Sequence, residues 1–261
     1  MKAQVAIAPD RLGDMFQLQE RLMKHYFDTD RLPAEYPLPT LQTQQYQDVI
    51  RDYLGYVDEE MSEMYEEYKK VNAASKENTE HFTKEDWEDL QKKVLSVHEE
   101  ASDITHFLIE IMIFLNIDDL TYRSYIEKVS IRPGLDKIDG LTASYQSVEH
   151  LSGPELANAL GIPFYSMGDI SIKVSDARLK FFEEAWLSCH HAMMKVRMFM
   201  KAKPWRVKPD NPDIQSIQGN ICEAFSLWFV MLQAIGIDAE PLHQMYKYKN
   251  NKNFERITQG W

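Results

Sequence analysis

The chain has 261 residues, 44% of them hydrophobic, and we expect one catalytic unit over residues 1–261. Its 10 glycines, against 13 methionines and 13 tyrosines, favour an all-α class over a turn-rich β-protein. A net charge of −12 argues against a nucleic-acid partner, and the longest apolar run, 104–117, is too short to span a membrane, so we predict a soluble, cytoplasmic protein.

Apolar residues at helical spacing predict four helices in the first half of the chain. They cover about residues 10–25, a segment that starts soon after 39 and runs to 70, 84–115 and 118–129. Prolines between 32 and 39 break the chain, and the polar stretch 72–81 is expected to form a loop. Thr83 and Asp86 have the spacing of a capping box, which predicts that the third helix starts at Lys84.

The second half of the chain begins with a stretch, 134–173, whose punctuation by Gly, Ser and Pro allows no assignment. A long helix is predicted over 175–200 and another over 214–235, which ends at Gly236. Asn211 as N-cap and Pro212 as a first helical residue are expected to start this second helix. A last helix is expected after Pro241. The cysteines Cys189 and Cys222 lie in apolar helical segments without a CxxC pattern, and we expect reduced core thiols.

Acidic pairs on the second and third predicted helices carry the chemistry. Glu60 and Glu63 share one helix face, and Glu100 and Asp103 share another, because residues three apart lie side by side. Antiparallel packing of the two helices would bring four carboxylates together, and clustered hard oxygen ligands suit Mg²⁺. Such an ion would also let an acidic chain bind a small polyphosphate. The remaining acids of the second helix are interpreted as solvated: Glu59, Glu66 and Glu67.

Two further residues of the third helix leave alternatives open. His106 follows Asp103 by one turn and is either a core histidine or a group that supports the metal ligands. Glu110, two turns beyond Asp103, either joins the carboxylates or meets a lysine from a neighbouring element.

The spacing E-E-x-x-E followed by E-x-x-D resembles the metal signature of the all-α nucleoside triphosphate pyrophosphatase superfamily, which includes dimeric dUTPases and MazG-like enzymes. The C-terminal segment from Tyr246 to Trp261 is similar to Y-x-x-K-N-x-x-N-x-x-R-Q-x-x-G-Y of the dimeric dUTPases. Seven positions correspond, six identical and the last aromatic for aromatic. Leu18-Gln19 in the first helix resembles the family's base-reading segment.

This resemblance implies a homodimer of helical bundles that hydrolyses dUTP to dUMP and pyrophosphate with Mg²⁺. It assigns the metal to Glu60, Glu63, Glu100 and Asp103, with Glu60 or Glu63 as the general base. It assigns the substrate to Gln19 at the base, to Lys249, Asn253 and Arg256 at the phosphates and sugar, and to the neighbouring motif residues Tyr246 and Asn250.

One departure from the family pattern leaves the substrate open. Met23 and Lys24 stand where the family usually has an asparagine one turn after the glutamine. The first alternative is therefore a MazG-like pyrophosphohydrolase for dCTP or for a modified or damaged deoxynucleotide. The second, of a different class, is a nucleotide-binding regulator that keeps the metal cluster and has no catalytic activity.

Overall fold

The computed structural model describes residues 10–32, 36–74, 82–128, 150–152, 171–200 and 212–259. Within them the fold is all-α, as the composition predicts, with seven helices: α1 (Arg11–Asp28), α2 (Gln44–Ala74), α3 (Lys84–Phe114), α4 (Asp119–Lys128), α7 (Asp176–Met200), α8 (Ile214–Ile235) and α9 (Ala239–Thr258). Two three-residue strands, β1 (His150–Ser152) and β2 (Ser171–Lys173), pair antiparallel with His150 opposite Lys173.

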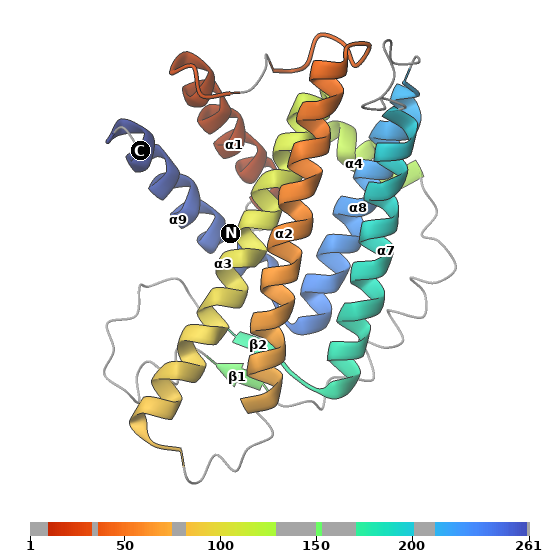
Figure 1. Ribbon diagram of the computed structural model, residues 1–261. Coiled ribbons are helices and arrows are strands. Elements are labelled where there is room, and N and C mark those ends of the chain that lie inside the picture. The colour runs from red at the N-terminus through yellow and green to blue at the C-terminus, as the bar shows by residue number, and fades with distance from the viewer. Residues whose placement is uncertain are drawn as a thin grey trace, which may run out of the picture.

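The long antiparallel pair α2 and α3 forms the centre of the bundle (Figure 1). Helices α7 and α8 form a second pair, in which α7 packs on α2 and α8 on α3, whereas α1 and α9 lie together against α3. One hydrophobic core includes side chains from all seven helices. Each helix of the central pair has 31 residues, a length of about 46 Å, so it extends well beyond the short helices α1 and α9.

Helix ends are set by local capping groups. The Thr83 side chain accepts from the backbone N–H of Asp86, whose carboxylate accepts from the Thr83 N–H, and this confirms the predicted capping box. Gly236 ends α8 with φ of 86°, a left-handed conformation that favours glycine. The predicted helix over 214–235 is confirmed by α8, but its predicted N-cap is wrong: Asp213, not Asn211, caps the helix, because its carboxylate accepts from the Ser216 N–H.

Two other boundaries differ from the prediction. Helix α2 continues to Ala74 and takes in Asn72, which was expected to start a loop; its buried amide donates to Asp176 at 3.2 Å. Helix α9 begins at Ala239, before Pro241, because a proline in the first turn removes no intrahelical hydrogen bond. The unassigned stretch 134–173 lies outside the described residues except for β1 and β2.

Both cysteines are free and buried, as expected. Among the described helices, no single one is long and apolar enough to cross a membrane, and only α8 with α9, bent by 113°, meets the length and composition of a span.

Candidate metal centre

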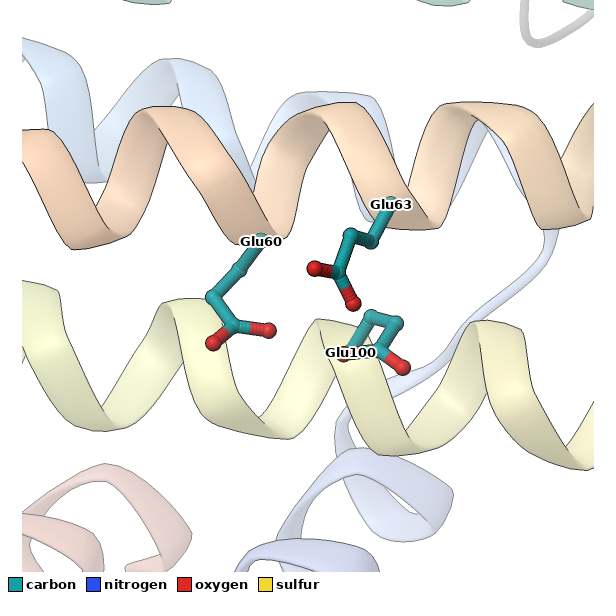
Figure 2. Close-up of side chains that lie close together, drawn as sticks. All are labelled: Glu60, Glu63 and Glu100. Carbon is teal, nitrogen blue, oxygen red and sulfur yellow. The ribbon is translucent and has the colours of Figure 1, made fainter.

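Three carboxylates meet at the interface of α2 and α3. Glu60 and Glu63 extend from α2 toward α3, and Glu100 extends from α3 to meet them (Figure 2). Each offers an oxygen within 4.8 Å of those of the other two. Glu63 is exposed, whereas Glu60 and Glu100 are half-buried, so solvent reaches the group at least through Glu63. The geometry brings together three of the four acids that the sequence singles out as metal ligands.

The protonation of these acids reflects their crowding. Burial, the hydrogen bond with Glu60 and the charges of Glu60 and Asp103 raise the pKa of Glu100 to about 8. Burial also raises the pKa of Glu60, with smaller contributions from the charges of Asp103 and Glu63. Like charges this close oppose one another's ionisation. A cation would remove that conflict, and carboxylate oxygens are the ligands that Mg²⁺ prefers.

The fourth predicted ligand, Asp103, pairs with a lysine. Its carboxylate lies 2.6 Å from the ammonium of Lys249 on α9, and both side chains are largely buried. Burial raises the pKa of Asp103, and Lys249 opposes this rise. Asp103 thus stands beside the three glutamates while it holds Lys249 next to them.

Helix α9 places its polar residues in a row beside the acids. Lys249, Asn253 and Arg256 are four and three residues apart and therefore share one helix face. Arg256 is exposed and Asn253 half-buried, and neither side chain makes a hydrogen bond or ion pair with a described residue. The positive charge of Arg256 nevertheless acts on the pKa of Asp103. These groups can therefore receive an anion close to the carboxylates.

The other three residues assigned to the substrate lie in the interior. Gln19 donates to Glu110 at 2.6 Å, and its carbonyl oxygen accepts from the Tyr246 hydroxyl at 2.7 Å and from Asn250 at 3.4 Å. Gln19, Tyr246 and Asn250 are each fully buried. The network joins α1, α3 and α9, and its hydrogen bonds fix the orientation of the Gln19 amide.

The two open alternatives on α3 receive an answer. His106 is buried, its Nδ1 donates to the carbonyl oxygen of Ser102 at 2.8 Å, and its ring stacks on Tyr246 at 3.8 Å. Burial lowers its pKa to about 3, so it is a neutral core histidine. Within the described residues Glu110 meets neither a lysine nor the carboxylate group, which contradicts both expectations for it: its partner there is Gln19.

An aromatic group that the sequence reasoning missed adjoins the carboxylates. Phe107 lies 5.3 Å from Tyr56 and 6.0 Å from Tyr53, measured between ring centres, and Tyr56 is 43% exposed. A signal was present, because Tyr56 precedes Glu60 by one helical turn and Phe107 follows Asp103 by one. These rings give the metal centre an apolar neighbour suited to a planar ligand.

Of the acids expected to be solvated, Glu59 and Glu66 are exposed as expected, whereas Glu67 is half-buried. Glu66 and Glu67 form surface pairs with Lys69 at 3.0 Å and Lys70 at 2.6 Å.

Comparisons with protein-family models, with curated proteins and with solved structures found no match to this chain.

Proposed function

We propose that the protein is a Mg²⁺-dependent pyrophosphohydrolase that cleaves dUTP to dUMP and pyrophosphate. The observation that carries the proposal is the convergence of Glu60, Glu63 and Glu100 within 4.8 Å, beside a row of polar and cationic residues on α9. Carboxylates that hold Mg²⁺ next to cations that hold phosphate oxygens are what hydrolysis of a triphosphate requires.

The metal fits the donor set. Glu60, Glu63 and Glu100 supply oxygen atoms only, and the raised pKa values of Glu60 and Glu100 indicate a site short of positive charge. Asp103 adds a fourth oxygen donor one turn from Glu100. Bound there, Mg²⁺ would lower the pKa of a water molecule and neutralise charge on the leaving pyrophosphate.

The side chains divide the remaining work. Lys249 and Arg256 hold the phosphates, and Asn253 holds the sugar or a phosphate through its amide. A water molecule attacks the α-phosphorus, the bond from this phosphorus to the bridging oxygen breaks, and pyrophosphate departs. Glu63, which is exposed, or Glu60 accepts the proton that the water loses.

The choice of dUTP rests on the resemblance of the segment from Tyr246 to Trp261 to dimeric dUTPases. One observation favours a second substrate, dCTP or a modified pyrimidine: the Gln19 amide is engaged by Glu110 and Tyr246, and fully buried Met23 occupies the next turn. A regulator that binds nucleotide without turnover is the further alternative. The same resemblance implies a homodimer, and light scattering of the purified chain tests it.

Pyrophosphate release from each deoxynucleoside and ribonucleoside triphosphate, and from dUDP, in Mg²⁺ and then in EDTA, tests the function. We expect EDTA-sensitive turnover of uracil substrates and a loss of about hundredfold or more in Glu60→Ala, Glu63→Ala and Asp103→Ala. Glu59→Ala is the matched control, since Glu59 is an exposed acid next to Glu60. Full activity in the three variants would overturn the proposal, and tight nucleotide binding without turnover would favour the regulator.

A further inference from the structure

Glu110 is a buried carboxyl group that the metal centre does not use. It is 6% exposed, and one of its oxygens accepts from the Gln19 amide at 2.6 Å. It makes no other hydrogen bond and no ion pair with any residue that the structure describes. Its second oxygen has no partner in those parts of the chain, and it is not one of the fully buried atoms left unsatisfied there, so a ligand can supply its hydrogen bond.

The position of Glu110 relates it to the metal centre. Glu100, Asp103 and Glu110 recur at intervals of three and seven residues, so they lie along one face of α3. Seven residues of helix rise place Glu110 about 10 Å along the axis from Asp103. A nucleotide whose phosphates lie at Asp103 and Lys249 spans a similar length from the α-phosphorus to the far edge of its base.

Among the described residues, the surroundings of Glu110 are aromatic and polar, and no cationic side chain pairs with it. Gln19 contacts it from α1. Burial raises the pKa of Tyr26 on α1, Tyr53 on α2 and Tyr246 on α9, and the charge of Glu110 adds to each rise, so the three hydroxyls lie within electrostatic reach of it. Tyr53 also contacts the ring of Phe107, which stands on α3 between Asp103 and Glu110. A planar ring at this place would contact aromatic side chains while its edge reached the Glu110 carboxyl.

We propose that Glu110, held by Gln19, is the residue that binds the Watson–Crick edge of the pyrimidine base; this inference rests on the proposed nucleotide pyrophosphohydrolase function. A neutral carboxyl group presents one O–H donor and one acceptor side by side. Uracil offers N3–H and O4, and cytosine offers N3 and the N4 amino group, so either edge completes two hydrogen bonds with it. Gln19 is then a positioning residue that orients the acid.

The protonation state agrees with this role. Burial raises the pKa of Glu110 to about 8, so the carboxyl keeps its proton at neutral pH and can donate. Ionisation at higher pH removes the donor and leaves two acceptors, which cannot satisfy a carbonyl oxygen of uracil or N3 of cytosine.

Two variants of the full-length chain separate the base contact from other effects. Glu110→Gln keeps an adjacent donor and acceptor at every pH, whereas Glu110→Leu removes both. We would measure kcat and KM for dUTP, dCTP and inorganic triphosphate, which has no base, in Mg²⁺ from pH 6 to pH 9. Thermal melting of each variant verifies that it folds.

We expect Glu110→Leu to raise KM for the nucleotides about tenfold or more, with KM for inorganic triphosphate unchanged. The wild-type KM for nucleotides should rise above about pH 8, where the carboxyl ionises, and Glu110→Gln should remove this rise. An unchanged nucleotide KM in folded Glu110→Leu would overturn the inference and leave the proposed function standing. An equal rise in nucleotide KM in Glu110→Gln and Glu110→Leu would also overturn the inference.

A binding measurement distinguishes failure of the proposed hydrolase function from failure of the proposed base contact. If the wild type hydrolyses no triphosphate, calorimetry with dUMP and dCMP replaces kinetics. Binding that Glu110→Leu abolishes would support the base contact while the hydrolase proposal fell. No binding, or equal binding in both proteins, would overturn the inference as well.

Discussion

At the scale of single residues, the three clustered carboxylates favour metal binding but reduce the stability of the metal-free protein. Glu100 is held beside Glu60 and Glu63 with its pKa raised to about 8, so its ionised form opposes folding in the absence of a cation. This conflict is the expected property of a metal centre, because the arrangement is satisfied only when the ion is bound.

Replacement of Glu100 by glutamine tests this conflict. In EDTA at pH 8.5, above the pKa of Glu100, Glu100→Gln should melt about 2–4 °C above the wild type, because it removes one of three crowded charges. Added Mg²⁺ should stabilise the wild type and leave the variant unmoved. Glu59→Gln, which alters an exposed acid, should match the wild type in both conditions. Equal Mg²⁺ stabilisation of Glu100→Gln and the wild type would contradict the assignment.

A second residue-scale prediction concerns the pair of Lys249 and Asp103. Lys249→Ala leaves the largely buried Asp103 carboxylate without its partner at 2.6 Å and should cost about 1–3 kcal/mol in urea unfolding. The double variant Lys249→Ala, Asp103→Asn should recover most of that loss, since no unpaired charge remains. Its triphosphate KM should stay high, because the lysine that holds phosphate is still absent. A double variant with wild-type KM would separate Lys249 from the substrate.

At the scale of elements, the helices that could be predicted are those with a clear apolar period and a local cap. The third predicted helix began at Lys84 as expected because Thr83 and Asp86 cap each other within one turn. The polar sequence around Asn72 predicts a loop, whereas the residue is helical and its amide pairs with Asp176, more than a hundred residues away. Local sequence does not predict such a tertiary contact.

The residues of the candidate site also differ in whether local sequence could predict them. Glu60, Glu63 and Glu100 were accessible to sequence reasoning, because acids three apart on a helix must share a face and α2 and α3 are consecutive antiparallel helices. The hydrogen-bond network of Gln19 and Glu110 could not be predicted from the sequence, because it depends on how α1 and α9 pack on α3. Spacing within one helix predicts which residues point together, but not which element faces them.

Removal of a cap tests whether the end of α3 stabilises the bundle independently of the site. Thr83→Ala should lower the free energy of unfolding by about 1 kcal/mol, whereas Thr83→Ser should keep most of it. Turnover should not change, since Thr83 lies about 25 Å along the helix from Glu100. A fall in kcat with Thr83→Ala at a temperature where the protein is fully folded would show that this end of α3 is coupled to the centre.

At the scale of the whole molecule, the central pair α2 and α3 serves two sides of the bundle. One side packs on α7 and α8, and the other packs on α1 and α9 (Figure 1). The ion pair of Asp103 with Lys249 joins the acids to α9 on this second side. The interhelical pair of Tyr65 and Glu183, at 2.5 Å between hydroxyl and carboxylate, and the ring contact of Tyr68 with Phe182 belong to the packed side. These contacts help to hold α2 in the bundle, where it brings like charges close to those of α3.

This arrangement predicts how stability depends on pH. Glu100 and Glu110 each have a folded-state pKa of about 8 against an ordinary value of 4.5, so between these limits the folded protein holds more protons than the unfolded one. The contribution of Glu100 and Glu110 to the free energy of unfolding is therefore greatest below about pH 4.5 and decreases as pH rises to about 8. Asp86, Asp118 and Glu240 act in the opposite sense, because hydrogen bonds lower their pKa values and their contribution is lost in acid. The metal-free chain should accordingly be most stable on the acid side of neutrality.

Urea unfolding in EDTA from pH 4 to pH 9 measures how stability depends on pH. Two changes should separate the contribution of Glu100 from that of Glu110. Mg²⁺ should remove the part due to Glu100 by favouring its ionised form, and Glu110→Gln should remove the part due to Glu110 at any metal concentration. With both changes together, the decline between pH 5 and pH 8 should largely disappear. A decline that survives both would have its origin outside these two side chains: in Glu60 and Asp103, whose pKa values are also raised, or in the general repulsion of a chain with net charge −12, which added salt screens.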